Sequence, residues 1–240
     1  MLHRTRLGVL IPSSNVAMEP ILTRMIAELP DVSAHFGRFS VTEIGPSERE
    51  MAQFELEPRV AAAELLAQAK VQVIGWIGGT GWVGFDSEQR LCDEITRRTG
   101  VPSMTAILAL RDIFKATGVR RFALVSPYLA PIQQRCIETF AGGGFECVAE
   151  RHAELRDNFA FSEVTEEEIE RMTREVAQSK PDAITFMNTN FRSASVAARL
   201  ERELGIPMYD LIALGVYACL KMAGADPRRI SGWGELFNRR

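Results

Sequence analysis

Short apolar runs alternate with amphipathic helical patterns along this chain of 240 residues. The segments from Leu7 to Ile11 and from Val71 to Ile77 are largely apolar, as in strands that are buried on both faces of a sheet. A stretch with helical spacing follows each of them. This alternation predicts an α/β fold in which helices cover parallel sheets.

Glycine, proline and helix-capping residues divide the chain into its expected elements. Two segments are interpreted as capping boxes at the starts of helices, Asp86-Ser87-Glu88-Gln89 and Thr165-Glu166-Glu167-Glu168. Strands or extended stretches are expected at 7–11, 35–44, 71–77, 121–125, 145–149, 183–187 and 208–210. Helices are expected over about 18–25, 57–69, 86–98, 105–117, 128–140, 193–204 and 211–223, with another after residue 165.

The sequence repeats itself with an offset of about 105 residues. The stretch from Gly100 to Thr105 aligns with the stretch from Gly205 to Asp210, and each lies between a charged helix and an apolar one. The strand before Gly79 matches the strand before Asn188 in the same way. The repeat predicts two similar Rossmann-like halves with parallel sheets. The carboxyl ends of both sheets would then face one cleft, where open α/β sheets bind ligands.

Composition excludes several classes of function. The net charge is −3 and the sequence pI is about 5.8, which argues against a protein that binds nucleic-acid backbones. No apolar run reaches the roughly 20 residues that a membrane span requires. No secretory signal is visible before Pro12, and the four cysteines form no CxxC pair, so we expect a cytoplasmic protein with reduced thiols. The histidines are scattered, and no metal site is expected.

Polar clusters follow the expected strands and could bind a ligand. Hydroxyls, amides and helix N-terminal N–H groups can hold a carboxylate, and glycines let the backbone approach a ligand closely. Each cluster alone has a simpler interpretation, because Ser and Asn are ordinary helix caps and glycine-rich segments form tight turns. The clusters contain Ser14 and Asn15; Gly79, Thr80 and Gly81; Tyr128; Asn158; and Asn188 and Thr189.

These residues resemble those of a known family. The segment Pro12-Ser13-Ser14-Asn15, with Glu19 four residues further on, is similar to the opening of maleate cis-trans isomerases. Those enzymes belong with the arylmalonate decarboxylases in the aspartate/glutamate racemase superfamily. The similarity extends over most of the chain through the other polar clusters and through the segment from Leu200 to Pro207.

The resemblance implies two α/β halves related by a pseudo-two-fold axis, an active site between them and no cofactor. We assign 1–108 with about 212–240 to the first half, and 109–211 to the second. Asn15, Tyr128 and Asn158 match positions that bind substrate carboxylates, and Thr80 matches an oxyanion-holding hydroxyl. Ser14, Gly81 and Thr189 are expected to line the same substrate site.

The chain departs from the family at its two reactive positions. Maleate isomerases carry a cysteine at the end of one strand in each half, and the decarboxylases keep the second of these. The corresponding residues here are Gly79 and Asn188. An asparagine side chain can orient a ligand through hydrogen bonds, but it is no nucleophile and does not titrate near neutral pH. The four cysteines lie elsewhere and are interpreted as packed thiols.

The sequence therefore predicts a cofactor-independent isomerase or lyase that acts on a small carboxylic or dicarboxylic acid. Tyr128, Asp210 and Glu19 are the candidates for acid–base work, although Asp210 also fits a helix N-cap. An arylmalonate decarboxylase-like or hydrolytic enzyme with an oxyanion pocket, and a non-catalytic relative that binds small acids, remain as alternatives. We expect no nucleic-acid or membrane partner, and such folds are often homo-oligomers.

Overall fold

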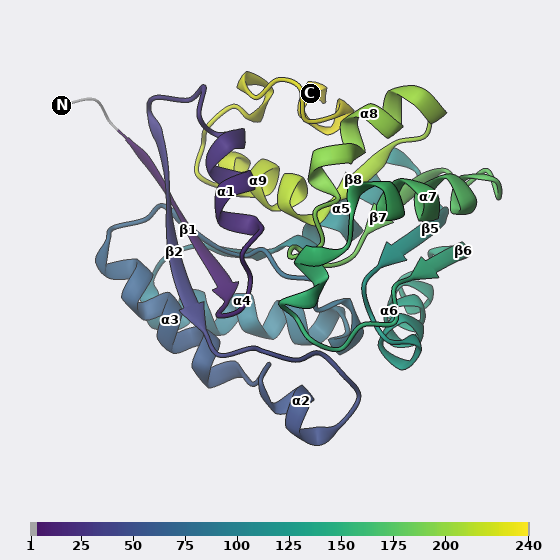
Figure 1. The fold of residues 1–240 in the computed structure, drawn as a ribbon. Coiled ribbons are helices and arrows are strands. Elements are labelled where there is room, and N and C mark those ends of the chain that lie inside the picture. Colours follow the sequence, from purple (N-terminus) through teal and green to yellow (C-terminus); the bar gives the residue numbers. More distant parts are fainter. Residues whose placement is uncertain (1–3, 240) are drawn as a thin grey trace.

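Each half of the chain builds one four-stranded parallel sheet (Figure 1). The computed structural model describes residues 4–239. The first sheet has the order β2-β1-β3-β4, and the second has the equivalent order β6-β5-β7-β8. The predicted α/β fold with two similar halves is confirmed. The strands are β1 (Thr5–Pro12), β2 (Val32–Phe39), β3 (Val73–Trp76), β4 (Ser103–Thr105), β5 (Arg121–Ser126), β6 (Glu146–His152), β7 (Ala183–Phe186) and β8 (Met208–Asp210).

Helices lie between the strands and cover the sheets, as the hydrophobic patterning requires. The α-helices are α1 (Met18–Met25), α2 (Glu48–Ala52), α3 (Leu56–Gln68), α4 (Phe85–Thr99), α5 (Ala106–Thr117), α6 (Ala130–Gly142), α7 (Glu166–Ala177), α8 (Ala194–Leu204) and α9 (Leu211–Met222). Short 3-10 helices are η1 (Gly81–Val83), η2 (Ala160–Glu163), η3 (Pro227–Arg229) and η4 (Glu235–Asn238). No helix within residues 4–239 is long and apolar enough to cross a membrane.

The internal repeat is visible in the element boundaries. Strand β8 and helix α9 begin 105 residues after β4 and α5, and both pairs have equal lengths. The preceding helices α4 and α8 end at Gly100 and Gly205, whose φ angles are 69° and 66°. Glycine adopts this left-handed conformation without the steric cost that a Cβ atom would bring, so both helices end in the same way.

Helices α5 and α9 link the two halves. Helix α9 packs on β3, where a Cβ atom on Gly75 would lie only 2.6 Å from Sγ of Cys219. On α5, the ring of Phe114 lies 5.5 Å from that of Phe122 in the second half. Each half is thus covered in part by the helix that follows the other half's last strand. On this basis we retain, as a proposal, the division into 1–108 with about 212–240 and 109–211.

The helices differ from the prediction at two places. Asp86 does not cap α4, because that helix already begins at Phe85, after Gly84 with its φ of 87°, and has no side-chain cap. Glu88 is therefore free to turn inward, and it is fully buried. Helix α2 was not predicted, although Ser47 and Glu50 form a complete capping box at its start.

Candidate functional site

Residues from both halves meet where the strands of the two sheets end. Tyr128 follows β5, and its hydroxyl donates a hydrogen bond of 2.8 Å to the carbonyl oxygen of Gly79, which follows β3. Asn188 follows β7, and its Nδ2 donates to the Tyr128 hydroxyl oxygen at 3.3 Å. The structure thus places three of the predicted site residues in direct contact.

Gly79 lies too close to its neighbours to carry a side chain in this arrangement. A Cβ atom there would lie 2.5 Å from Oη of Tyr128 and 2.8 Å from the backbone nitrogen of Asn188. Asn188 itself has a φ of 104°, a conformation that is costly for residues with a side chain. Its Oδ1 accepts a hydrogen bond of 2.6 Å from the backbone N–H of Asn190, which helps to hold it. The two strand ends are therefore fitted tightly together.

The Asn15 side chain forms hydrogen bonds both with the start of α1 and with the second half of the chain. Its Oδ1 accepts hydrogen bonds from the backbone N–H groups of Ala17 and Met18 at the start of α1, at 3.1 and 3.0 Å. Its Nδ2 donates to Oγ1 of Thr189 at 3.1 Å. The cap that the sequence allowed is present, and the amide nitrogen faces the second half.

Ser14 and Asn158 form a second contact between the halves. Nδ2 of Asn158 donates to Oγ of Ser14 at 2.7 Å, and that hydroxyl donates to the carbonyl oxygen of Val41. The segment around Asn158 is held in place by the loop after β2, because the backbone N–H of Asn158 donates to the carbonyl oxygen of Thr42 at 2.9 Å. Asn15, Asn158, Asn188 and Thr189 are all at most 5% exposed.

Asn190 also belongs to this cluster; its polar segment after β7 was predicted to lie near the site, but Asn190 itself was assigned no role. Its Oδ1 accepts hydrogen bonds of 2.9 and 3.1 Å from the backbone N–H groups of Val16 and Ala17. Its Nδ2 donates to the carbonyl oxygen of Asn158. A residue of the second half thereby caps a helix of the first. The available signal was its position in the polar segment that follows β7.

Thr80 and Gly81 lie beside this cluster with a different orientation. Oγ1 of Thr80 accepts a 2.7 Å hydrogen bond from Nε1 of Trp76 and is also hydrogen-bonded to Oε1 of Glu88. A Cβ atom on Gly81 would contact Met187 and Cys136, so this glycine faces apolar and thiol groups. The predicted oxyanion role of Thr80 is therefore linked to Glu88, which was not among the predicted site residues.

Asp210 has the structural role that was its alternative interpretation. Its Oδ1 caps α9 by accepting from the N–H groups of Ile212 and Ala213, at 2.8 and 3.1 Å. Its Oδ2 accepts from Oγ of Ser193 at 2.5 Å. Burial raises the pKa of Asp210 to about 6, against these hydrogen bonds, which favour the carboxylate. Its use as a catalytic base remains a prediction.

The Tyr128 phenol and the buried thiols near the cluster are neutral at physiological pH. Burial raises the pKa of Tyr128 well above its ordinary value of 10. Burial also raises the pKa of the Cys136 thiol, which lies near Tyr128, and raises the pKa values of Cys92 and Cys219 to about 12. A thiol with such a pKa is a poor source of thiolate. The cluster thus offers neutral hydrogen-bond donors and no activated nucleophile.

A groove of about 420 Å³ borders the cluster at Val16 and Ala17. Its lining includes the cationic side chains of Arg24 and Arg192 and the acidic Glu166. It is a route by which a small anion could approach the start of α1.

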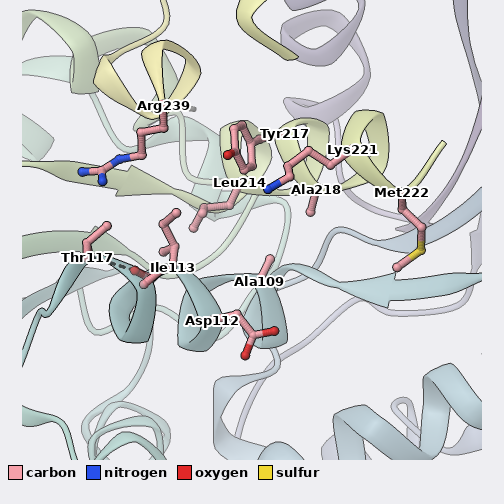
Figure 2. A pocket seen from close by; sticks show the side chains of 11 residues that line it. Ala109, Asp112, Ile113, Thr117, Leu214, Tyr217, Ala218, Lys221, Met222 and Arg239 are labelled. Atoms are coloured by element: carbon pink, nitrogen blue, oxygen red, sulfur yellow. Dashed lines mark hydrogen bonds between the residues drawn. The ribbon is translucent and has the colours of Figure 1, made fainter. Parts of the chain in front are cut away.

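A pocket of about 550 Å³ lies elsewhere, between α5 and α9 (Figure 2). Its walls include Ile113, Leu214 and Tyr217, with Lys221 and Arg239 at its polar parts, and they include none of the predicted site residues. In the part of the chain that the structure describes, no group of three or more His, Cys, Asp or Glu side chains is arranged to hold a metal ion.

A family model described as arylmalonate decarboxylase matches residues 26–237. The chain belongs to the arylmalonate decarboxylase family. Among curated members, a maleate isomerase from Nocardia farcinica is 24% identical over 98% of this chain and 96% of its own length. An arylmalonate decarboxylase from Bordetella bronchiseptica is 22% identical over 97% of this chain and 96% of its own length.

Solved structures of both enzymes share the fold. A Nocardia farcinica maleate cis-trans isomerase variant, which carries a covalently bound succinylcysteine intermediate, superposes with a TM-score of 0.87. It is 23% identical, and the match covers 97% of this chain and 98% of that one. An arylmalonate decarboxylase superposes with a TM-score of 0.80 at 18% identity, over 98% of this chain and all of the other.

The family fold thus accommodates both activities, and this member has no cysteine in the cluster that joins its strand ends. Its cysteines are Cys92, Cys136, Cys147 and Cys219. Three of them are buried, and the fourth is half-buried on β6. Their placement agrees with the interpretation as packed thiols.

Proposed function

We propose that this protein is a cofactor-independent lyase or isomerase that acts on a small carboxylic or dicarboxylic acid and stabilises an oxyanion on it. The observation that carries the proposal is the contact between Tyr128, Gly79 and Asn188 at the junction of the two halves. It places a phenolic hydroxyl and a side-chain amide together in a buried setting, and such preorganised donors stabilise the charge that develops in a transition state.

In this structure, the hydrogen-bond donors of the cluster bond to acceptors within the cluster itself. The amide nitrogens of Asn15 and Asn158, for example, donate to hydroxyl groups across the junction. A carboxylate is a stronger acceptor than a hydroxyl, because charge-assisted hydrogen bonds are shorter and about twice as strong as neutral ones. An entering acid would therefore replace these contacts as the strand ends separate to admit it.

The proposed chemistry proceeds through an enediolate. In decarboxylation, the bond between the α-carbon and one carboxylate breaks, CO2 leaves, and the electron pair moves into the remaining carboxyl group. In isomerisation of an acid with an sp³ α-carbon, transfer of the α-proton to a base, for which Asp210 is the predicted candidate, gives the same species. The hydroxyl of Tyr128 and the amide of Asn188 would hold the negative oxygens. Because asparagine has no proton to release, the carbon would be reprotonated from water or from another group.

A covalent route is disfavoured by the geometry. Addition of a thiolate to the substrate would require a cysteine in the cluster, and the cysteine nearest to Tyr128 among those described above, Cys136, is a buried neutral thiol. We therefore favour the enediolate route over covalent addition to an alkene.

Proton NMR in D2O tests the proposal, with phenylmalonate, maleate and phenylacetate as the added acids. Loss of CO2 from phenylmalonate with deuterium at the α-carbon would support the lyase. Exchange of the α-protons of phenylacetate would support the isomerase. Conversion of maleate to fumarate would contradict the enediolate route, because maleate has no sp³ α-carbon from which a proton could be removed. Line broadening with no conversion of any acid would overturn the enzyme proposal in favour of a non-catalytic protein that binds small acids.

A further inference from the structure

A buried carboxyl group lies directly behind Thr80. Glu88 on α4 has no exposed surface, and its Oε1 is hydrogen-bonded to Oγ1 of Thr80. Its Oε2 is also buried, and it has no hydrogen-bond partner. The same Thr80 oxygen accepts the indole N–H of Trp76 at 2.7 Å. A fully buried acid with one unpartnered oxygen is unusual, and its cost calls for a functional reason.

The hydrogen-bonding capacity of the Thr80 hydroxyl explains what this acid can do. A hydroxyl has one proton and two lone pairs. Trp76 uses one lone pair of Thr80. If Glu88 is ionised, its carboxylate accepts a hydrogen bond from the Thr80 hydroxyl. Thr80 then has only one lone pair left to offer to a ligand. If Glu88 is protonated, its own O–H can donate to Thr80, and the Thr80 proton is free to point elsewhere.

We propose that Glu88 is a positioning residue whose protonation turns the Thr80 hydroxyl into a donor toward the site at Gly79. This inference rests on the proposed function, because a donor at Thr80 is useful only if an anion binds next to it. With Glu88 ionised, Thr80 would present a lone pair to that anion and repel it. Binding and turnover should therefore require the neutral acid.

The surroundings of Glu88 place its proton equilibrium near neutrality. Burial raises its pKa to about 7, against the opposing effects of the Thr80 and Thr105 hydroxyls and of the Arg59 guanidinium on α3. On its own helix, the titratable neighbour is the thiol of Cys92, whose pKa is raised in turn by the Glu88 charge. With a folded pKa above the ordinary 4.5, Glu88 is protonated at pH 6 and ionised at pH 8.

The second half of the fold contains an acid and a hydroxyl at the positions equivalent to Glu88 and Thr105. Ser193 and Asp210 lie 105 residues after Glu88 and Thr105, so the acid and the hydroxyl exchange places between the halves. In that pair, both oxygens of Asp210 are hydrogen-bonded, one to Ser193 and the other to the start of α9. Asp210 is thus a static cap, whereas Glu88 caps no helix and faces the Thr80 and Thr105 hydroxyls.

The indole N–H of Trp76 reports on the switch without any ligand. In the ¹⁵N-labelled protein, its NMR signal should shift between pH 5.5 and 8.5 with a midpoint near 7. The signal should not shift in Glu88→Gln, which cannot ionise. Asp210→Asn should keep the shift, and the indole of Trp233 serves as a reference. A Trp76 signal that is constant in the wild-type protein, or that still titrates in Glu88→Gln, would overturn the inference. Thr80→Val, which removes the hydroxyl, gives a second test should Glu88→Gln not fold.

Calorimetric binding of phenylacetate separates this inference from the proposed function. The neutral fraction of an acid with a pKa of 7 falls about tenfold between pH 6 and pH 8, so the affinity of the wild-type protein should fall about tenfold. The affinity of Glu88→Gln should change less than twofold. If the Trp76 signal titrates and the affinity does not, Glu88 does not act on the site. If phenylacetate binds to neither protein and the NMR panel shows no conversion, the proposed function fails, while the Trp76 titration still decides whether the switch exists.

Discussion

At the scale of single residues, the junction of the two halves depends on a missing side chain. The backbone of Gly79 lies against Asn188 and the Tyr128 hydroxyl, and a Cβ atom there would be at most 2.9 Å from three of their atoms. Any side chain at this position would force the strand ends apart, so the close contact of the halves depends on the glycine.

Replacing Gly79 with alanine tests this close contact. The added methyl group should destabilise the fold by about 1–3 kcal/mol, the usual cost of overpacking. Urea unfolding measures the change. Gly142→Ala is a matched control, because nothing lies within 4 Å of a Cβ atom at that position. Equal unfolding midpoints for Gly79→Ala and the wild-type protein would show that the halves are not in contact at Gly79.

The residue scale also shows what a sequence pattern cannot specify. Asp86 and Gln89 have the spacing of a capping box, but the pattern does not say where the carboxyl group of the intervening Glu88 points. Helix α4 begins one residue before Asp86, and Glu88 lies on the buried face. Glu88 pairs with Thr80, and its charge is influenced by Thr105 and by Arg59, so the local spacing of a capping box could not identify these contacts.

At the scale of elements, helix α1 is capped by two asparagines from different halves. Asn15 comes from the helix's own N-terminal segment, and Asn190 comes from the segment after β7. The first could be predicted, because Ser and Asn before a helix are common caps. The second could not, because it depends on how the halves pack.

Asn190→Ala should therefore weaken α1 and the junction together. The backbone N–H of Val16 would lose its acceptor, whereas that of Ala17 would keep Asn15, and the net cost of the lost hydrogen bonds should be about 1 kcal/mol. Hydrogen exchange of these two amides measures the effect directly and should become faster at Val16. Thr165→Ala, which removes the cap of the exposed start of α7, is the control and should leave both amides unchanged. Unaltered exchange in Asn190→Ala would mean that this cap is not formed.

At the scale of the whole molecule, the repeat in the sequence was sufficient to predict two similar halves. The offset of 105 residues between Gly100 and Gly205 is the offset between the last strands and helices of the halves. Parallel strands with helical connections end on the same edge, so the polar clusters were expected to converge. Tyr128, Gly79 and Asn188 do so. The pairing of donors across the junction could not be predicted, since it depends on side-chain directions.

The molecule therefore has the fold of its family and, where its strands end, a cluster of neutral hydroxyl and amide hydrogen-bond donors. Its relatives include maleate isomerases and an arylmalonate decarboxylase, and their structures superpose over nearly the full chain. In this member, the oxyanion would be held by hydroxyl and amide groups, and the ionisation of Glu88 would set whether Thr80 contributes.

We propose that Tyr128 stabilises negative charge on the substrate, and the Tyr128→Phe variant tests this role. The measurement is kcat/KM for the acid that the wild-type protein converts fastest in D2O. Loss of one such donor should lower kcat/KM by about 10²–10³. Tyr217→Phe removes a hydroxyl that lies in the pocket between α5 and α9, and it should change kcat/KM less than twofold. Turnover by Tyr128→Phe at the wild-type rate would show that the Tyr128 hydroxyl does not stabilise this charge.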